Sequence, residues 1–462
     1  MAERRGGALL SAIVALIVAA SAAWWYAGLP AGGRPAASDG TAPGKNGGAA
    51  APAAPAAAGV WTGTWSASPV SGEPGTETDG MAGRTVRNVV HTSVGGVLAR
   101  ITLSNLFGTA DLTVTHATIA LAADRRTGEE RTGGERPAGG RGAAAALGTM
   151  RRVTFGGSPE VVVPAGGEVV SDAVALTVPY DSDVLVSVYA PGGAGPVTHH
   201  PLARQTGYVA EGERTADLSG AAYAADGDRW RWLTALDVYG RQAQGTLVAF
   251  GDSITDGVTA TRDADHRWPD VLADRLREAA REGADVPRYG VVNAGVGGNR
   301  VLTDVQAAPL KNPSALHRFD RDVLSRPNVR VVVVDLGIND ILRGPAAPEA
   351  ILAGLRTLVD RAHAHGVKVI GSTLTPFLGH RGHTAQREAV RQHINEEIRG
   401  GGVYDAVVDF DEALRDPSDP RRLLPEYDSG DHLHPGDEGY RAMAGLLDLR
   451  ELRAPAPARL AA

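Results

Sequence analysis

The stretch Val329–Asp335, with the sequence VRVVVVD, decides how the fold of this chain is interpreted. Its four consecutive valines favour a β-strand, because β-branched side chains pack well on a pleated surface. A strand with one face in water alternates apolar and polar residues, and Val331–Val334 does not alternate. The stretch therefore predicts a strand that is buried on both faces, as in a parallel sheet covered by helices on each side.

Short apolar strands and amphipathic helices alternate on both sides of this stretch. The expected strands are Thr246–Phe250, Tyr289–Asn293, Val329–Asp335, Val367–Ser372 and Ala406–Asp409. The expected helices are Trp268–Glu282, Pro348–His365, Thr384–Arg399 and Gly436–Leu447. This alternation predicts a three-layer α/β domain over residues 244–455, with right-handed crossovers. In such a sheet, functional sites form beyond the carboxyl ends of the strands.

Four segments at predicted strand ends or in loops carry the residue types of serine-based acyl transfer. They are Gly251–Gly257 (GDSITDG), Asn293–Asn299 (NAGVGGN), Gly337–Asp340 (GIND) and Asp431–Pro435 (DHLHP). The Ser253 hydroxyl is a poor nucleophile unless a base such as the His434 imidazole takes its proton. Asp431 precedes His434 by three residues, so in a turn its carboxylate can hold the imidazole in one tautomer. We therefore expect Ser253, His434 and Asp431 to be catalytic.

Acyl transfer also needs hydrogen-bond donors for the oxyanion that forms on the attacked carbonyl. The candidates are the backbone N–H groups of Ser253 and Gly298 and the side-chain amide of Asn339. Gly298 suits this role because the absence of a Cβ lets the backbone approach a ligand closely. Taken singly, each segment has a plainer interpretation, such as a turn, a helix cap or a surface ion pair. Their joint occurrence in this order predicts an active site.

Together the four segments resemble the signature blocks of the SGNH, or GDSL, hydrolase superfamily, over roughly residues 244–449. The resemblance implies a flavodoxin-like α/β/α fold and ester hydrolysis without a cofactor or a metal. It matches Ser253 to the family's nucleophile and Asp431 and His434 to its acid and base. It matches Gly298 and Asn339 to its oxyanion donors, although the adjacent Gly297 leaves open which of the two backbone amides faces the oxyanion.

The first block has isoleucine where the family's name has leucine, a departure that preserves the chemistry. The wider pattern, including Arg318–Asp322 (RFDRD), is similar to bacterial acylhydrolases of polysaccharide degradation.

Several other polar residues near these segments are expected to be structural. Asp256 and Asp340 are expected to cap helices or brace loops, and His432 is expected not to be the base. The histidine pairs His363/His365 and His380/His383 have spacings that could ligate a metal, but no third ligand accompanies them. We therefore expect no metal site.

Residues 60–240 show a different pattern, which is typical of an all-β module. Val97–Leu103, Leu112–Thr115 and Val184–Tyr189 are short apolar or alternating runs, and glycine and proline separate them. The pattern predicts an antiparallel β-sandwich or jelly-roll-like accessory domain. Within it, the charged and glycine-rich stretch at about residues 124–142 is expected to be a disordered surface insertion.

The first 59 residues are expected to be a targeting segment followed by a linker. Arg4 and Arg5 precede an uncharged stretch, and small residues follow at Ala20–Ala22, which is typical of a secretory signal peptide. A membrane anchor over residues 1–29 is the alternative, because the uncharged stretch is long enough for one span. Residues 30–59 are rich in Ala, Pro and Gly and are expected to form a flexible linker. Either interpretation places the rest of the chain outside the cytoplasm, secreted or anchored.

The composition excludes several classes of function. The 462 residues contain no cysteine, so disulfides, thiolate metal sites, iron–sulfur clusters and a cysteine nucleophile are excluded. The 46 Lys and Arg against 53 Asp and Glu leave a net charge of -7, without a basic block, so nucleic acid is not an expected partner.

The expected function is that of an extracytoplasmic serine ester hydrolase that acts through an acyl-serine intermediate. Its substrate would be a small-molecule or polysaccharide ester, with deacetylation of carbohydrate as one candidate reaction. Lipase- or lysophospholipase-like activity and aryl esterase activity are alternatives. A hypothesis of another class is a polysaccharide- or cell-wall-binding protein in which the α/β domain is an inactive support; the complete set of catalytic segments argues against it.

Overall fold

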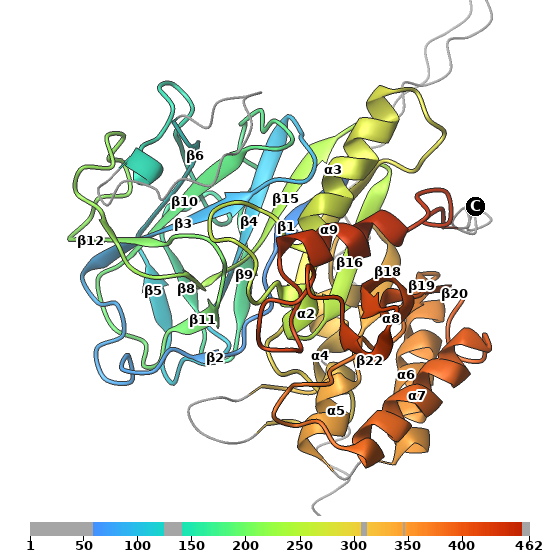
Figure 1. The fold of residues 1–462 in the computed structure, drawn as a ribbon. Coiled ribbons are helices and arrows are strands. Elements are labelled where there is room, and N and C mark those ends of the chain that lie inside the picture. Colours follow the sequence, from blue (N-terminus) through green and yellow to red (C-terminus); the bar gives the residue numbers. More distant parts are fainter. Residues whose placement is uncertain (1–58, 124–140, 306–311, 345–346, 455–462) are drawn as a thin grey trace, which may run out of the picture. The chain divides into compact units, whose positions relative to one another are not determined.

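The computed structural model describes residues 59–123, 141–305, 312–344 and 347–454 (Figure 1). The expected leader, the linker up to residue 58 and residues 124–140 of the expected insertion lie outside the described residues. All described residues belong to one compact unit. Of the helices described, none is both long enough and apolar enough to cross a membrane.

Five parallel strands form the sheet of the second half of the chain. They are β16 (Gly245–Gly251), β17 (Tyr289–Gly295), β18 (Val329–Asp335), β19 (Lys368–Ser372) and β20 (Ala406–Val408). Their order across the sheet is β17-β16-β18-β19-β20, and every neighbouring pair is parallel. This is the flavodoxin-like order, in which the first strand lies between the second and the third. Val331–Val334 is fully buried in β18, which confirms the expected strand that is buried on both faces.

Helices cover both faces of this sheet, as Figure 1 shows. The helices are α2 (Ser253–Asp256), α3 (Trp268–Arg281), α4 (Ala315–Phe319), α5 (Ile338–Arg343), α6 (Pro348–His363), α7 (Ala385–Arg399), α8 (Phe410–Leu414) and α9 (Asp437–Leu446). Leu247 and Val331 pack in an apolar cluster with α3, α8 and α9. Val248 and Val332 point to the opposite layer and pack with α4, α6 and α7. The predicted three-layer architecture is therefore confirmed.

The four long helices agree with the expected ones to within two residues at each end. The short helices α2, α4, α5 and α8 were not among the helix ranges expected from periodicity, because four to six residues are too few to show a helical period. A π-helical turn, Asp320–Leu324, continues α4, and the hairpin β21 (Arg415–Asp416) and β22 (Asp419–Leu423) follows α8.

The first half of the described chain consists of antiparallel strands, which confirms the expected all-β class. The strands are β1 (Val60–Ser66), β2 (Ser71–Gly72), β3 (Arg84–His91), β4 (Leu98–Ser104), β5 (Leu112–Val114), β6 (His116–Leu121), β7 (Arg151–Arg152), β8 (Val161–Val163), β9 (Glu168–Val170), β10 (Asp183–Ala190), β11 (Thr198–Pro201), β12 (Tyr208–Glu211), β13 (Ala224–Ala225), β14 (Arg229–Arg231) and β15 (Leu233–Gly240). The larger sheets are β13-β12-β3-β10-β6-β7, β1-β15-β4-β9 and β14-β11-β2. One apolar core contains residues of all three, including Val86 in β3, Trp65 in β1 and Trp230 in β14.

The β-rich region covers the outer edge of the parallel sheet. The Gly63 N–H in β1 donates to Thr246 Oγ1 at 2.9 Å, and the Val291 N–H in β17 donates to Ser93 Oγ at 3.0 Å. The backbones approach so closely that a Cβ on Gly290 would lie 2.1 Å from the Gly63 carbonyl oxygen. Strand β17 is the edge strand, and this contact satisfies backbone groups that an open edge would expose.

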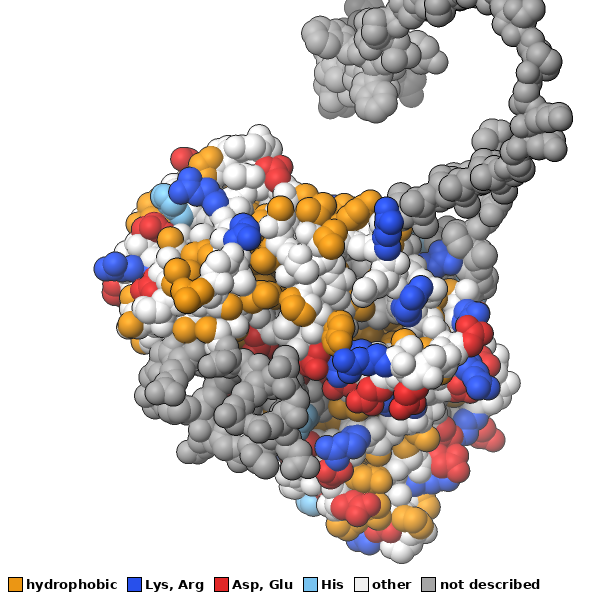
Figure 2. All heavy atoms as spheres, turned by 90° about the horizontal axis from the view of Figure 1, so that it is seen from above, with side chains coloured by type: hydrophobic (Ala, Val, Ile, Leu, Met, Phe, Trp, Pro, Cys, Tyr) orange, Lys and Arg blue, Asp and Glu red, His pale blue; other side chains and the backbone are white. Residues whose placement is uncertain are grey.

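The charge on the face shown in Figure 2 is mixed. On the face shown in Figure 2, Lys and Arg side chains lie among Asp and Glu side chains, and no large area carries one sign.

Candidate active site

The candidate nucleophile lies at the first turn after β16. Gly251 ends this strand, and a Cβ there would lie 2.1 Å from Thr255 Oγ1, so the turn requires glycine. Asp252 then caps α2 by accepting a hydrogen bond from the Ile254 N–H at 3.0 Å. Ser253 is the first residue of α2 and is only 8 % exposed. The tight turn therefore places its hydroxyl beyond the carboxyl end of the sheet.

His434 joins Ser253 to Asp431, although 181 residues separate the serine from the histidine. His434 Nε2 lies 2.8 Å from Ser253 Oγ, and His434 Nδ1 lies 2.5 Å from Asp431 Oδ2. The other oxygen of Asp431 accepts the N–H groups of Leu433 and His434 at 3.0 and 2.8 Å. The three side chains thus have the connectivity that nucleophile, base and orienting acid require. The structure brings together the three predicted catalytic residues, and their roles remain predictions.

The Asp431 carboxylate is held in its ionised form. Partial burial raises its pKa, but the hydrogen bonds from the His434 side chain and backbone outweigh burial, so the net pKa lies below the ordinary value. An ionised Asp431 accepts a hydrogen bond from the protonated Nδ1 of His434. The unprotonated Nε2 of His434 can then accept the proton of Ser253.

The neighbouring histidine has a carboxylate of its own. His432 Nδ1 lies 2.6 Å from Asp428 Oδ2, and the His432 backbone has a φ of 62°. A Cβ on Gly379 would lie 2.8 Å from the His432 ring, so this ring packs against the loop after β19. His432 therefore contacts Asp428, whereas His434 contacts both Asp431 and Ser253.

The backbone amides of Gly297 and Gly298 differ in whether they already donate a hydrogen bond within the protein. The Gly297 N–H donates to Asp256 Oδ2 at 3.1 Å, whereas no described residue accepts the Gly298 N–H. Gly298 has a φ of 71°, in the region that favours glycine. Of the two amides that the sequence left open, Gly298 is therefore the one available to an oxyanion.

Asn339 reaches the site from α5, after β18. It is 3 % exposed, and its Nδ2 donates to Asp252 Oδ2 at 3.0 Å. An amide nitrogen carries two hydrogens, so the second remains for a substrate oxygen. Both of the other predicted oxyanion donors are thus linked to the turn that carries Ser253. Asn339 is linked to it by its bond to Asp252, and the loop that carries Gly298 is linked to it by the bond from the Gly297 N–H to Asp256.

Asp252 and Asp335 carry buried carboxyl groups near Ser253 that were not singled out from the sequence. Burial raises the pKa of Asp252 well above its ordinary value, and the charge of Asp335 adds to the effect. Burial also raises the pKa of Asp335 to about 6, although Thr255 Oγ1 and Ser372 Oγ donate to it at 3.1 and 2.8 Å. Their positions at the ends of β16 and β18 were the available signal in the sequence.

Arg318, which entered the sequence analysis only within a wider pattern, holds two strand ends together. It is fully buried, and its guanidinium donates to the carbonyl oxygens of Gly251 and Ala294, each at 2.8 Å. It also donates to Asn299 Oδ1 at 3.0 Å and to Asp322 at 3.0 Å. The loops that carry Ser253 and Gly298 therefore share one cationic support.

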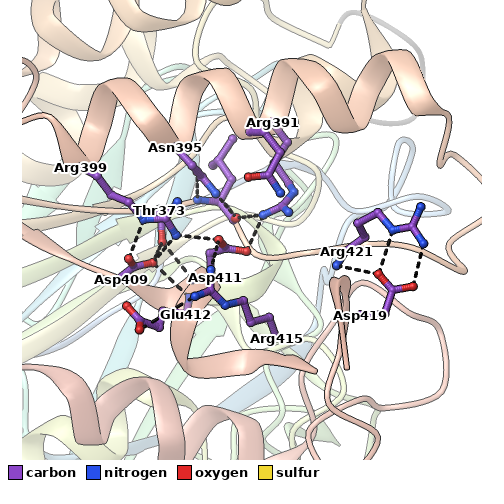
Figure 3. A network of polar contacts seen from close by, with 12 residues as sticks. Thr373, Arg391, Asn395, Arg399, Asp409, Asp411, Glu412, Arg415, Asp419 and Arg421 are labelled. Atoms are coloured by element: carbon purple, nitrogen blue, oxygen red, sulfur yellow. Dashed lines mark hydrogen bonds and ion pairs between the residues drawn. The ribbon is translucent and has the colours of Figure 1, made fainter. Parts of the chain in front are cut away.

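A polar network fixes the loop that follows β19, as Figure 3 shows. Arg391 in α7 is fully buried and donates to the Leu374 carbonyl at 2.8 Å and to Asp411 at 2.6 Å. Thr373 Oγ1 donates to Asp409 at 2.8 Å. These bonds anchor the start of a loop whose later residue Gly379 lies against the His432 ring.

His380, later in the same loop, feels the charges of Asp431 and His434. Burial lowers the pKa of His380, and the charge of Asp431 opposes that shift.

Of the histidines that the sequence offered as possible metal ligands, His363 and His365 are exposed, and His363 lies 3.0 Å from Asp405. Among the described residues, the group that could hold a metal ion is His91, Asp183 and Asp265, whose ligand atoms lie within 4.8 Å of one another. His91 Nδ1 lies 3.0 Å from Asp183 and Nε2 lies 3.2 Å from Asp181, so both ring nitrogens face carboxylates. This is the arrangement of a protonated imidazole, which donates a hydrogen bond from each ring nitrogen.

Comparison with known families bears on the second half of the chain. Residues 249–442 match the GDSL-like lipase/acylhydrolase family. No curated protein sequence matches the chain.

Many solved structures are similar to part of the chain. A member of the lipolytic protein G-D-S-L family from Veillonella parvula DSM 2008 is 20 % identical, over 43 % of this chain and 94 % of that one, with a TM-score of 0.32. The acetyl xylan esterase AlAXEase is 20 % identical, over 43 % and 96 %, with a TM-score of 0.33. A family two carbohydrate esterase from Clostridium thermocellum, in complex with cellohexaose, is 13 % identical over 79 % and 89 %, with a TM-score of 0.32.

Proposed function

Since residues 249–442 form a domain of the GDSL-like lipase/acylhydrolase family, and the chain is accordingly a carboxylic ester hydrolase, we propose that Ser253, His434 and Asp431 carry out the hydrolysis. The observation that carries this proposal is the position of the His434 ring, 2.8 Å from Ser253 Oγ on one side and 2.5 Å from Asp431 on the other. A base in this position can take the proton of the hydroxyl as it attacks.

The first half of the reaction forms an acyl-serine. Ser253 Oγ attacks the ester carbonyl carbon while His434 Nε2 takes the hydroxyl proton, and the carbonyl oxygen becomes an oxyanion. The N–H groups of Ser253 and Gly298 and the Asn339 amide donate to this oxyanion. The carbon–oxygen bond to the alcohol then breaks, and His434 returns the proton to the leaving oxygen. Asp431 stabilises the imidazolium between these two steps.

The second half releases the acid. A water molecule attacks the acyl carbon, and His434 takes one of its protons. The bond to Ser253 Oγ breaks, the proton passes from His434 to Oγ, and the free acid leaves. No step needs a redox partner, and each proton that His434 accepts is returned.

Two finer proposals concern the cellular location of the enzyme and its substrate. The expected leader at residues 1–29 supports action outside the cytoplasm. The similarity of the Arg318–Asp322 pattern to acylhydrolases of polysaccharide degradation supports deacetylation of carbohydrate. Lipase-like and aryl esterase activity are the competing reactions, and a comparison of acyl-chain lengths separates them.

The test is turnover of p-nitrophenyl acetate and of longer p-nitrophenyl esters by the wild type and by Ser253→Ala. We expect the variant to lose about three to six orders of magnitude in kcat, because the nucleophile and its base act as one unit. Ser325→Ala, at an exposed serine outside the site, is the matched control and should keep full activity. Wild-type turnover by Ser253→Ala would refute the proposed mechanism. A rate that falls with acyl length supports deacetylation, and one that rises supports a lipase-like enzyme.

A further inference from the structure

A histidine of the β-rich region contacts the helix that carries the nucleophile. His200 lies in β11, and its Nε2 lies 2.9 Å from Oδ1 of Asp256, the last residue of α2. The two side chains are each only 4 % exposed. The contact joins residues 56 positions apart, across the boundary between the antiparallel strands and the parallel sheet.

The His200 ring is held at both nitrogens. Its Nδ1 lies 2.7 Å from the Ser68 carbonyl oxygen, which can only accept, so Nδ1 carries a proton. Burial lowers the pKa of His200, but the Asp256 carboxylate outweighs burial and the net pKa is raised. An imidazolium that donates from both nitrogens fixes the ring between the β-rich backbone and α2.

The second oxygen of Asp256 continues the chain of contacts toward the oxyanion donors. Asp256 Oδ2 accepts the Gly297 N–H at 3.1 Å, and Gly298 is the next residue. The contacts therefore run from Ser68 through His200 and Asp256 to Gly297. A shift of the His200 ring would move Asp256, and with it the peptide that precedes the Gly298 amide.

We propose that His200 is a positioning residue for ester hydrolysis: acting through Asp256, it sets the orientation of the Gly298 amide toward the oxyanion. The inference rests on the proposed function, because it assigns a purpose to that donor. An oxyanion donor stabilises the transition state only when it lies about 2.7–3.1 Å from the oxyanion, so displacement lowers kcat more than substrate binding. The β-rich region would thus take part in catalysis without touching the substrate.

Two substitutions separate the two bonds of the ring. A glutamine amide reaches roughly the place of Nε2, and an asparagine amide roughly that of Nδ1. We expect His200→Asn to lower kcat about 10- to 100-fold with little change in KM, since the bond to Asp256 is lost. His200→Gln should retain most of the activity. His199→Asn is the matched control, because His199 is the adjacent residue of β11, is 5 % exposed and bonds to the Ser71 carbonyl at 2.9 Å. It should leave kcat unchanged.

A double-mutant cycle tests the route through Asp256. In an Asp256→Ala background, His200→Asn should lower kcat little further, since the bond between His200 and Asp256 has already been removed. The inference is overturned if His200→Asn keeps the wild-type kcat, if His199→Asn loses as much, or if the losses of His200→Asn and Asp256→Ala multiply. Should His200→Asn fail to fold, His200→Gln and Asp256→Ala give the same decision: the first must retain kcat and the second must lose it. A wild type without ester turnover would instead refute the proposed function, before any variant is compared.

Discussion

At the scale of single residues, the assignment of the base depends on which carboxylate each histidine meets. His432 and His434 are two positions apart, and each has Nδ1 within 2.6 Å of an aspartate. They differ in the other ring nitrogen, because only that of His434 has a described hydrogen bond to Ser253. The three-residue spacing from Asp431 favoured His434 in the sequence, but in the structure both rings lie beside carboxylates, so the contact with Ser253 is what separates them.

The two histidines should therefore respond very differently to the same substitution. His434→Gln removes the group that takes the Ser253 proton, so kcat should fall by about three to six orders of magnitude. His432→Gln should change kcat by less than about tenfold, because its partner is Asp428. Steady-state kinetics on p-nitrophenyl acetate, with thermal unfolding as a check of folding, measures both. A crippled His432→Gln beside an active His434→Gln would reverse the assignment.

At the scale of elements, α2 and the end of β17 are packed backbone to backbone. A Cβ on Gly295 would lie 2.2 Å from the Asp256 amide nitrogen. Helix α2 has only four residues, so its position depends on this contact, on its cap and on Arg318 at the adjoining strand ends. The absence of a side chain at Gly295 is thus what allows α2, which carries Ser253, to lie against the end of β17, which leads to Gly298.

Gly295→Ala should damage both stability and activity. The added methyl group must displace the α2 backbone, which we expect to cost about 1–3 kcal/mol of unfolding free energy and to lower kcat. Gly297→Ala is a suitable comparison, since a Cβ there would meet only Asp256 Oδ2, at 3.8 Å, and should cost less. Chemical denaturation and esterase kinetics measure the pair. Equal effects at the two positions would show that close packing at Gly295 is not the cause.

At the scale of the whole described molecule, the β-rich region and the parallel sheet are joined by buried polar contacts. His91 is the clearest case, because it pairs with Asp181 and Asp183 of the β-rich region and lies 3.6 Å from Asp265, which follows α2. Burial lowers the pKa of His91, but the three carboxylates outweigh burial and raise the pKa to about 10. The protonated ring is therefore part of what holds the two regions together.

The pH dependence of stability should reflect His91. A histidine whose pKa is higher in the folded than in the unfolded state contributes stability in full below the unfolded value. That contribution is lost as the pH rises from about 6.5 to about 10, so Tm should fall over this range. His91→Gln should have a lower Tm at pH 6.5 and a flatter profile. His365→Gln, at an exposed histidine, should retain the wild-type profile. Parallel wild-type and His91→Gln profiles would exclude this contribution.

The elements that the sequence predicted are those whose signal is local. The valines of β18 and the amphipathic period of α3, α6, α7 and α9 are patterns of neighbouring residues, and the structure confirms them. The same holds for the strand ends at which Ser253, Gly298 and Asn339 occur, because the carboxyl ends of parallel strands meet at one edge. The short helices were missed because one turn leaves no period to detect.

What the sequence determined by itself is therefore the order of strands and helices and the chemical groups that follow them, since both depend on residues close together along the chain. The sequence predicted Ser253 and His434 as partners, and the tertiary structure brings the two side chains into contact. The tertiary structure alone decided that the Gly297 N–H donates to Asp256. It also decided that His200 contacts Asp256 and that Arg318 donates to the carbonyl oxygen of Gly251. These contacts join residues up to 181 positions apart, and a separation of that size leaves no pattern in any stretch of sequence.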